Sequence, residues 1–350
     1  MNKRVTLREI AEAAGVHYST ISLALRDHPN VSVPVREKIK KLASDMGYTP
    51  DPALSALNAY RKTKLTVHYQ STLAWIDNWE PTKLRAASTF NEYYTGAATR
   101  ARQLGYELEE FCLEKEGISP ERASRILHSR GIKGLLLAPQ PESGMRLPFD
   151  YERFSSVTFG YSLQPRVFHL VTNHQFHSLT LALDKLTELN YKRIGMFIPQ
   201  DIDEKVDNMY LSAHWNFYRK HKKARRIEPC LYKAGGSRPA FPPWFQKHKP
   251  DVIMSFGGIP VLEMLENMGL NVPGDVGYIQ LSVGSNEPEI SGVYENGLLI
   301  GRTAVDFLVG MLQRGEMGFP EVPIRIQVEG SWRQGKTVRE PAGCTEILPH

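Results

Sequence analysis

The sequence predicts an α/β protein in which a helix-turn-helix domain of three helices precedes two doubly wound lobes. Three observations carry this prediction. A helix-capping pair, a glycine turn and two short apolar helix faces follow one another within residues 5–25. From residue 71 onward, short apolar runs alternate with amphipathic stretches, which is typical of a parallel sheet covered by helices on both faces. This pattern restarts near residues 160–165, so we expect two lobes with a cleft between them.

The N-terminal helices have local start and stop signals. Thr6 followed by Glu9 forms a capping box, so the first helix should begin at Leu7. Gly15 should end it, because a helix commonly ends where the chain needs a left-handed residue. A second helix is expected over about 17–25, and a third after Ser32, which is a good N-cap. On the second helix, Ile21, Ala24 and Leu25 should face inward, and Tyr18, Ser19, Ser22 and Leu23 outward.

The charge is concentrated in this same part of the chain. Residues 1–64 hold eleven Lys/Arg and six Asp/Glu, an excess of five that equals the formal net charge of the whole chain, +5. Cations gathered in one small segment are what neutralisation of DNA phosphates requires, because affinity for duplex DNA depends strongly on counterion release. Charge and motif together predict a DNA-binding domain rather than an ordinary solvated surface.

Composition limits the class of protein further. A chain of 350 residues can form one small and two larger units. Its three cysteines, Cys112, Cys230 and Cys344, match no metal-ligand spacing and suit a reducing cytoplasm. No stretch approaches the ~20 apolar residues that span a bilayer, and the N-terminus shows no apolar leader. We therefore expect a cytoplasmic protein without a membrane partner.

Motifs for catalysis and cofactor binding are missing from the sequence. Gly235-Gly236 and Gly257-Gly258 have neither the Walker lysine nor a full G-x-G-x-x-G pattern. There is no G-x-S-x-G, and the eleven histidines form no H-E-x-x-H. We expect no enzyme activity, no cofactor and no metal.

The first fifty residues resemble the DNA-binding domain of the LacI/GalR family of bacterial regulators. The resemblance is carried, without insertion, by Val5-Thr6-Leu7, Ile10-Ala11, Ala14-Gly15-Val16, Thr20-Ile21-Ser22, Val31-Ser32, Arg36-Glu37-Lys38-Ile39 and Gly47-Tyr48-Thr49-Pro50. It implies that the second helix enters the major groove, with Tyr18 and Ser19 as base readers and His17 at the edge of the contact. It also implies phosphate contacts by Thr6, Thr20, Ser22 and Ser32.

Three positions depart from the family pattern. His17 replaces the frequent Ser, Leu23 the usual Arg and Arg26 the usual Asn. Leu23 cannot make the bidentate contact that Arg makes with guanine, although it can touch a thymine methyl group. We therefore expect a target that differs from the common sites of the family.

A short hinge should join the DNA-binding domain to the lobes. Asp51 is a suitable N-cap and Pro52 a suitable first helical residue. A helix of some eight residues is marginal alone in water, so it should form when two copies pair on DNA. By the resemblance, Leu57 would wedge into the minor groove and bend the DNA; the alternative is a linker leucine that packs on its own domain.

The body should contain alternating strands and helices. Strands are expected at 72–76, 107–112, 134–138, 156–159, 193–198, 251–255 and 276–281, and helices near 87–104, 120–130, 175–189, 208–221, 260–268 and 298–314. Crossings between the lobes are expected near 161–165, 289–295 and 318–323. The predicted domains are therefore 1–50 for DNA binding, 51–65 for the hinge and linker, and 66–340 for the body. Lobe 1 would span about 66–162 and 295–320, and lobe 2 about 163–294 and 321–340.

Weaker family motifs recur in the body, among them Gly105-Tyr106, Ile132-Lys133-Gly134 and Pro273-Gly274-Asp275-Val276. They imply a periplasmic-binding-protein-like domain whose cleft binds a small effector. Most of the polar residues with which the family grips its ligand are replaced here, as by Asn173-His174 and Leu281-Ser282. Because ligands bind at the carboxyl ends of strands in such sheets, the candidate effector residues are Asp77, Trp79, Phe159, Tyr161, Asn173, His174, Asp207, Tyr210, Phe256, Ser282 and Asn296. Aromatic, amide and carboxylate side chains would suit a sugar-like ligand.

The sequence therefore predicts a transcriptional regulator, a repressor that binds a pseudo-palindromic operator as a homodimer. Two half-sites are expected because one short helix reads few base pairs. Two alternatives remain open. The body could have lost its ligand, leaving a regulator or architectural protein without an effector. The second alternative is a solute-binding protein of the same fold, but such a protein would not need the basic N-terminal domain.

Overall fold

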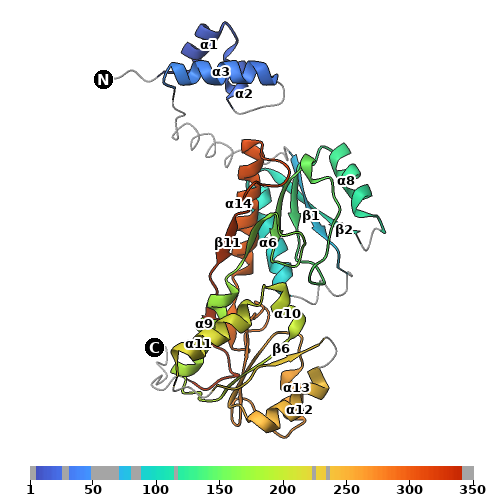
Figure 1. Ribbon diagram of the computed structural model, residues 1–350, viewed down its shortest axis with the longest axis vertical. Coiled ribbons are helices and arrows are strands. Elements are labelled where there is room, and N and C mark those ends of the chain that lie inside the picture. The colour runs from blue at the N-terminus through green and yellow to red at the C-terminus, as the bar shows by residue number, and fades with distance from the viewer. Residues whose placement is uncertain are drawn as a thin grey trace, which may run out of the picture.

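The computed structural model describes residues 5–25, 31–48, 71–79, 88–113, 117–222, 226–233 and 237–340. Figure 1 shows a small helical domain and two α/β lobes. Among the described helices, none combines the length and the apolar character that crossing a membrane would need.

The N-terminal domain consists of α1 (Leu7–Ala14), α2 (Tyr18–Ala24) and α3 (Val33–Asp45). The capping box is present: the Thr6 side chain accepts from the backbone N–H of Glu9, whose carboxylate accepts from the backbone N–H of Thr6 at 2.7 Å. Gly15 has φ +64°, in the left-handed region expected at the end of α1. Ile10, Ile21 and Ile39 form the buried centre of the domain, one from each helix. The helix-turn-helix prediction is confirmed.

Lobe 1 is built on a six-stranded sheet in the order β11-β5-β4-β3-β1-β2, and every pair in it is parallel. Its strands are β1 (Ser71–Asp77), β2 (Tyr106–Cys112), β3 (Gly134–Leu137), β4 (Ser155–Phe159), β5 (His169–Asn173) and β11 (Arg325–Val328). A 3-10 turn, η1 (Tyr151–Arg153), precedes β4.

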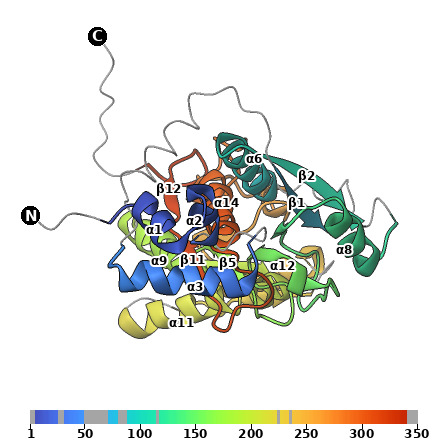
Figure 2. The ribbon, with the colours of Figure 1, turned by 90° about the horizontal axis from the view of Figure 1, so that it is seen from above.

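Helices cover both faces of this sheet, because successive residues of a strand point to opposite sides. Leu73 and Trp75 of β1 pack with α6 (Ser88–Gln103) and α14 (Gly297–Arg314). Ala74 and Ile76 pack on the other face, with α8 (Pro120–Ser129). Seen from above, β1 and β2 lie between α6 and α8 (Figure 2).

The helices α6 and α14 lie side by side although about two hundred residues separate them (Figures 1 and 2). Their contact is close at Gly301 of α14, where an added Cβ would lie 2.0 Å from the carbonyl oxygen of Tyr93. A side chain at this position would hold the two backbones apart.

Lobe 2 has a second six-stranded sheet in the order β12-β10-β9-β8-β6-β7, in which β12 runs antiparallel to β10 and the other pairs are parallel. Its strands are β6 (Ile194–Pro199), β7 (Cys230–Tyr232), β8 (Val252–Ser255), β9 (Gly277–Gln280), β10 (Gly292–Tyr294) and β12 (Ser331–Arg333). Helices α9 (Gln175–Glu188) and α11 (Met209–Lys220) cover one face, and α12 (Ser237–His248) and α13 (Val261–Glu266) the other. The short α10 (Gln200–Lys205) follows β6.

This architecture confirms the predicted fold class, and each expected strand and helix of the body is present. The sequence missed α12, because Pro242 and Pro243 lie inside it and proline is a strong signal against helix. It also missed α10 and the strands β5, β7, β10, β11 and β12, and these strands all lie at or next to an edge of their sheet.

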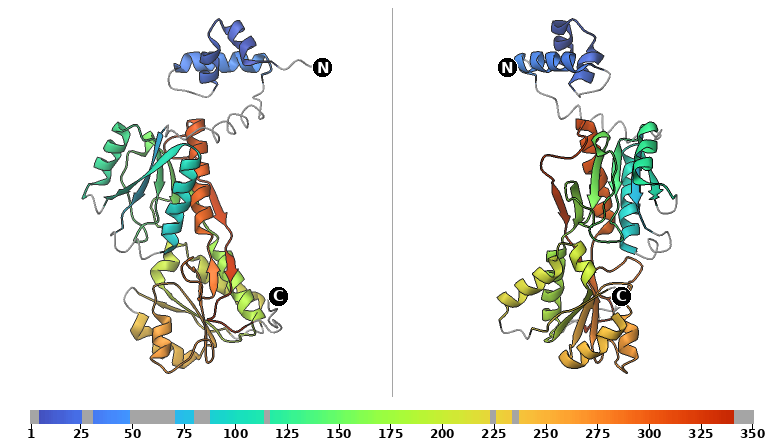
Figure 3. Two further views of the ribbon diagram at one scale, coloured as in Figure 1. Left: turned by 180° about the vertical axis from the view of Figure 1, so that it is seen from behind. Right: turned by 45° about the vertical axis from the view of Figure 1, so that its right-hand side comes forward.

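The chain crosses between the lobes three times, as Figure 3 shows from two sides. The crossings fall between β5 and α9, between β10 and α14, and between β11 and β12. The expected crossings near 161–165 and 318–323 are therefore several residues too early. The physical reason is that β5 and β11 pair with each other in lobe 1, from Arg325 opposite Leu170 to Val328 opposite Asn173.

Candidate functional site

The outer face of α2 presents the residues expected to read bases. Tyr18 is 49% exposed, and Ser19 is also exposed. Thr20 and Leu23 are half-buried at the flanks of this face. Arg26 and Leu57 lie outside the described residues, as does the side chain of Ser22, so their assignment to DNA contacts stays a prediction.

His17 is the N-cap of α2. Its Nδ1 accepts from the backbone N–H of Ser19 at 3.3 Å and lies 2.8 Å from Oγ of the same residue. An imidazole nitrogen thus takes the place of the serine hydroxyl that the family usually has here, and it satisfies a backbone donor at the helix start. The departure from the family pattern at His17 leaves the helix capped.

The hydroxyls expected to contact phosphates differ in their surroundings. The Thr6 hydroxyl is already engaged with Glu9, 3.3 Å from its backbone nitrogen and 3.0 Å from its carboxylate. Ser32 is the N-cap of α3, is exposed and makes no side-chain capping bond. A helix N-terminus of this kind offers backbone N–H groups to a phosphate.

A cavity of about 490 Å³ lies between the two lobes. Residues of both lobes line it, including Phe90 of α6 in lobe 1 and Phe256 after β8 in lobe 2. Six of the eleven predicted effector residues line this cavity: Trp79, Tyr161, Asn173, Tyr210, Phe256 and Ser282. The strand-end argument therefore located the cavity, and binding by these residues stays a prediction.

Five predicted residues are not among those that line the cavity, and each has another structural role. Phe159 is fully buried in lobe 1, with its ring centroid 5.1 Å from that of Trp75. Asp77 is buried and accepts from the backbone N–H of Trp79 at 3.2 Å, while burial raises the pKa of its carboxyl. The other three are polar residues that bond to other chain segments. His174 and Asn296, at two of the crossings, bond to the Glu329 side chain and backbone, and Asp207, between α10 and α11, bonds to Arg166.

Several lining residues were not predicted from the sequence. Phe90 and Tyr93 are spaced i, i+3 on α6, a pattern typical of core residues. Lys205 belongs to α10, a helix that the sequence analysis missed. Gln140 follows β3 and Gln175 begins α9, so a wider window after each strand end would have found both.

Aromatic rings form much of the cavity wall. The centroids of Trp79 and Phe90 are 5.7 Å apart, and those of Tyr210 and Phe256 are 5.2 Å apart in an edge-to-face pair. The indole N–H of Trp79 donates to the carbonyl of Pro139 at 2.6 Å, which fixes the ring in place. Such rigid apolar surfaces hold a ligand while a few polar groups orient it.

Two buried amides supply polar groups to the same cavity. The Gln175 nitrogen donates to Thr172 Oγ1 and Asn173 Oδ1, at 3.1 and 2.6 Å. The Gln140 nitrogen donates to the carbonyl of Ala138 at 2.7 Å. In the described part of the chain, Oε1 of Gln140 and of Gln175 has no hydrogen-bond partner. Buried acceptors of this kind are costly when unpaired, so they favour a ligand that brings hydroxyl donors.

The cavity also contains two ionisable groups with displaced pKa values. Burial raises the pKa of Glu295 to about 7, a shift that hydrogen bonds from Tyr93 and Ser282 partly oppose and the nearby Glu92 reinforces. Burial lowers the pKa of Lys205, against the attraction of Asp201 and Glu142. The Lys205 ammonium lies 6.0 Å from the centroid of the Trp79 ring.

Polar contacts hold the lobes in the present arrangement. Arg166 of lobe 1 donates to Asp207 of lobe 2 at 2.5 Å. Glu92 of α6 accepts from the Tyr294 hydroxyl at 2.8 Å and from the backbone N–H of Ser285 at 3.0 Å, both in lobe 2. A change in the angle between the lobes would have to break or rearrange these bonds.

A helix-turn-helix domain joined to a two-lobed α/β body with an interlobe cavity defines a class of DNA-binding transcriptional regulators. Residues 6–51 match the family model for bacterial regulatory proteins of the lacI family. This match and the relatives described below confirm the resemblance to the LacI/GalR family of transcriptional regulators.

Two relatives match over most of the chain. The HTH-type transcriptional regulator CelR of Thermobifida fusca is 24% identical and covers 93% of this chain and 96% of its own length. The lactose operon repressor of Escherichia coli (strain K12) is 22% identical, with 89% and 86% covered. These relatives are transcriptional regulators rather than enzymes.

Solved structures share the fold at low sequence identity. A complex of the transcriptional regulator CelR with cellobiose has a TM-score of 0.59 at 19% identity and covers 95% of this chain and 100% of that one. The lac repressor dimer bound to operator and the anti-inducer ONPF has a TM-score of 0.56 at 16% identity, with 96% and 99% covered.

Proposed function

We propose that this regulator is a repressor that binds a pseudo-palindromic operator as a homodimer, with an affinity that a sugar-like ligand in the interlobe cavity controls. The observation that carries the proposal is the cavity itself: aromatic walls and the unpaired acceptors of Gln140 and Gln175, placed between two lobes of a DNA-binding chain. A polyhydroxylated ligand would pair both acceptors and lie against the rings.

The likeness to sugar complexes supports the ligand class. Besides the cellobiose complex, a LacI-family regulator from Weissella paramesenteroides with bound glucose has a TM-score of 0.55, at 14% identity and with 76% of this chain covered. The residues that line the cavity of this chain, and not those of the relatives, would select which sugar it binds.

Homodimer formation follows from the small size of the reading helix. The seven residues of α2 can reach only a few base pairs, and two half-sites related by a two-fold axis supply the missing specificity. Control by the ligand follows from differential affinity: a ligand that prefers one arrangement of the lobes shifts DNA affinity by that preference and no more.

The DNA half of the proposal is tested on Tyr18 and Ser19. Replacing both with Ala should abolish the preference for the operator and leave weak, salt-dependent binding, because phosphate contacts carry no sequence information. Ser44→Ala, at an exposed position near the end of α3, is the matched control. Genome-wide footprinting identifies the operator sequence. If the double variant still prefers the operator over other DNA, base reading belongs to other residues.

The ligand half is tested by thermal shift of the purified protein against a panel of mono- and disaccharides, followed by operator binding with each sugar that shifts the melting temperature. Gln175→Ala should weaken sugar binding by about tenfold or more, since it removes a buried partner of the ligand. Gln246→Ala, exposed on α12, should leave it unchanged. If no sugar stabilises the protein or alters operator binding, the sugar-like effector is refuted, which leaves an effector of another class or a regulator without one.

The hinge assignment makes a separate prediction. Leu57→Ser should reduce operator bending, measured by gel mobility on circularly permuted sites, because the serine cannot wedge between base pairs. Unchanged bending would support the linker alternative.

A further inference from the structure

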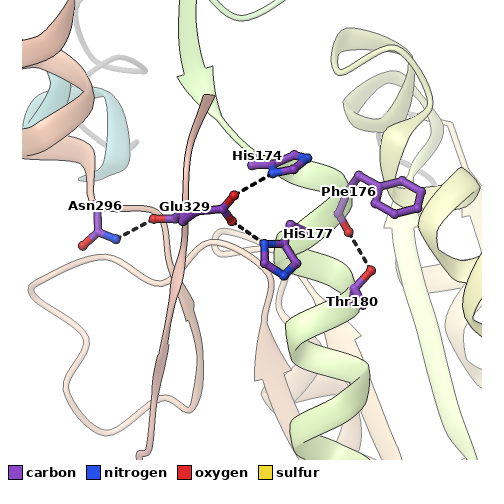
Figure 4. Close-up of polar contacts among 6 residues, drawn as sticks. All are labelled: His174, Phe176, His177, Thr180, Asn296 and Glu329. Atoms are coloured by element: carbon purple, nitrogen blue, oxygen red, sulfur yellow. Dashed lines mark hydrogen bonds and ion pairs between the residues drawn. The ribbon is translucent and has the colours of Figure 1, made fainter. Parts of the chain in front are cut away.

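Three potential metal ligands, His174, His177 and Glu329, gather where the chain crosses between the lobes (Figure 4). The β5–β11 register explains their proximity. Val328 pairs with Asn173 at the ends of the two strands, so the residues that follow them, Glu329 and His174, also lie together. The backbone N–H of His174 donates to the carbonyl of Val328 at 2.9 Å, which extends this pairing into the crossing.

The helix α9 supplies the third residue. His174 is the N-cap of α9, and His177 follows three residues later, on the same face of the helix. Figure 4 shows both imidazoles turned toward the one carboxylate. Nδ1 of His174 lies 2.9 Å from one carboxylate oxygen of Glu329, and Nδ1 of His177 is hydrogen-bonded to the other.

A residue of the crossing between β10 and α14 fixes the backbone of Glu329. Asn296, which precedes α14, donates from its side-chain nitrogen to the carbonyl of Glu329 at 2.7 Å. All three crossings therefore meet at Glu329, and its carboxylate is presented to the two imidazoles from an anchored backbone.

We propose that His174, His177 and Glu329 form a binding site for a divalent transition-metal ion of the zinc class. The candidate ligand atoms, one from each residue, all lie within 4.8 Å of one another. In a tetrahedral zinc site with bond lengths near 2.1 Å, ligand atoms are separated by about 3.4 Å. To admit the ion, the His174 imidazole has to move about half an ångström from the carboxylate, and the closer His177 imidazole has to move further.

The chemistry of the three groups fits this ion. Two imidazole nitrogens and a carboxylate are a common zinc ligand set, and water completes the coordination. On binding, each Nδ1 directs its lone pair at the metal, and a neutral ring carries its proton on Nε2. Burial acts to raise the pKa of Glu329, but hydrogen bonds from the two histidines outweigh it and hold the pKa below its usual range.

The surroundings also allow an ion to enter. The side chains of His174, His177 and Glu329 are 30%, 56% and 58% exposed. None of the three is among the residues that line the interlobe cavity. The proposed metal ligands are thus different residues from those that line the cavity, although Asn173 and Gln175, which flank His174, line it.

A bound ion would link Glu329 in the third crossing with His174 in the first and His177 in α9 of lobe 2. The hydrogen bonds now joining these groups would be replaced by stronger metal–ligand bonds. The ion would therefore stabilise the present arrangement of the lobes. Sequence motifs could not reveal this site, because 152 residues separate His177 from Glu329.

The test uses the full-length protein, stripped of metal with a chelator and titrated with Zn²⁺ in competition with a chromogenic chelator at neutral pH. We expect one equivalent bound per chain. His177→Gln and Glu329→Gln should each weaken binding by at least about tenfold, since even the loss of a residue that only hydrogen-bonds to a ligand commonly costs that much. His128→Gln on α8 and Glu266→Gln on α13, both exposed, are the matched controls and should bind as the unmodified protein does.

Co²⁺ provides a second readout, because tetrahedral coordination gives intense visible absorption bands that depend on the ligands. The bands should appear with the unmodified protein and change or disappear in His177→Gln. Circular dichroism verifies that each variant is folded, as expected for substitutions of exposed side chains. Absence of a bound equivalent at micromolar Zn²⁺, or full affinity in both ligand variants, would overturn the proposal.

Discussion

Replacing Glu295 with Gln should remove a large part of the pH dependence of the body's stability. Glu295 follows β10 in the second crossing and is 7% exposed. The Tyr93 hydroxyl donates to its carboxylate at 2.9 Å. Burial is the main cause that raises its pKa from 4.5 to about 7, and neighbouring Glu92 adds to the shift. The folded protein therefore holds a proton that the unfolded chain releases.

The size and sign of the effect follow from these two pKa values. Below about pH 4.5 both states carry the proton, and the contribution to stability is at its maximum. Above that pH only the unfolded chain loses the proton, so the free energy of unfolding falls by about 1.4 kcal/mol per pH unit until the folded pKa is reached. Between about pH 5 and pH 8 the loss amounts to about 2.5 kcal/mol, and the neutral amide of Gln does not contribute it.

The measurement is urea unfolding of the unmodified protein, Glu295→Gln and the control Glu266→Gln at both pH values. The change in free energy of unfolding between the two pH values should be smaller in Glu295→Gln by about 2.5 kcal/mol. Glu266 is exposed on α13, so its variant should follow the unmodified protein. An identical pH dependence in all three proteins would mean that Glu295 does not hold its proton in the folded state.

Two further predictions concern the frameworks of the N-terminal domain and of lobe 1. His17→Ala should destabilise α2 by about 1 kcal/mol through loss of the cap, and His17→Ser should restore the stability of the helix. Hydrogen exchange of residues 18–24 measures this, and equal exchange in both variants would refute the capping role. Gly301→Ala should destabilise lobe 1 by about 1–3 kcal/mol in urea unfolding, because its Cβ would meet the Tyr93 carbonyl. Gly310→Ala in the same helix is the control. It should be neutral or stabilising by up to about 1 kcal/mol, since its Cβ would meet only the flexible end of Arg314. An equal loss of stability in both variants would refute the argument that the backbones of α6 and α14 approach closely at Gly301.

The N-terminal domain was predicted almost completely because its signals are local. Thr6, Glu9 and Gly15 act within a few residues of one another, and their hydrogen bonds form inside the segment that contains them. The capping role of His17 was not foreseen. It depends on the direction of the imidazole ring, which a residue type does not specify.

The body was predicted where a local apolar pattern marks a strand or helix. The proline-containing α12 and strands at or next to the sheet edges were missed. β1 and β6 are buried apolar runs that any parallel sheet requires. Only one of the four residues of β11 is buried, and its pairing with β5 brings together segments about 155 residues apart, so no local pattern marks it as part of lobe 1. Because of this long-range pairing, two of the crossings lie later in the sequence than predicted.

The candidate cavity was predicted in part for a similar reason. Trp79 and Phe256 follow strands, so the rule that ligands bind at strand ends found them. Tyr93 lines the cavity from a helix, and its hydrogen-bond partner Glu295 is 202 residues away in the sequence. Which aromatic residue of a helix faces a cavity instead of the core depends on how the lobes are placed.

By itself the sequence determined the domain order, the helix-turn-helix, the α/β class and the resemblance to the family, because caps, periodicity and contiguous motifs are local properties of the chain. The tertiary structure alone decided where the chain crosses between the lobes and which side chains line the cavity. It also decided that His174, His177 and Glu329 meet. These properties arise from contacts between residues far apart in sequence, and the free energy of such contacts is set by packing and register rather than by residue type.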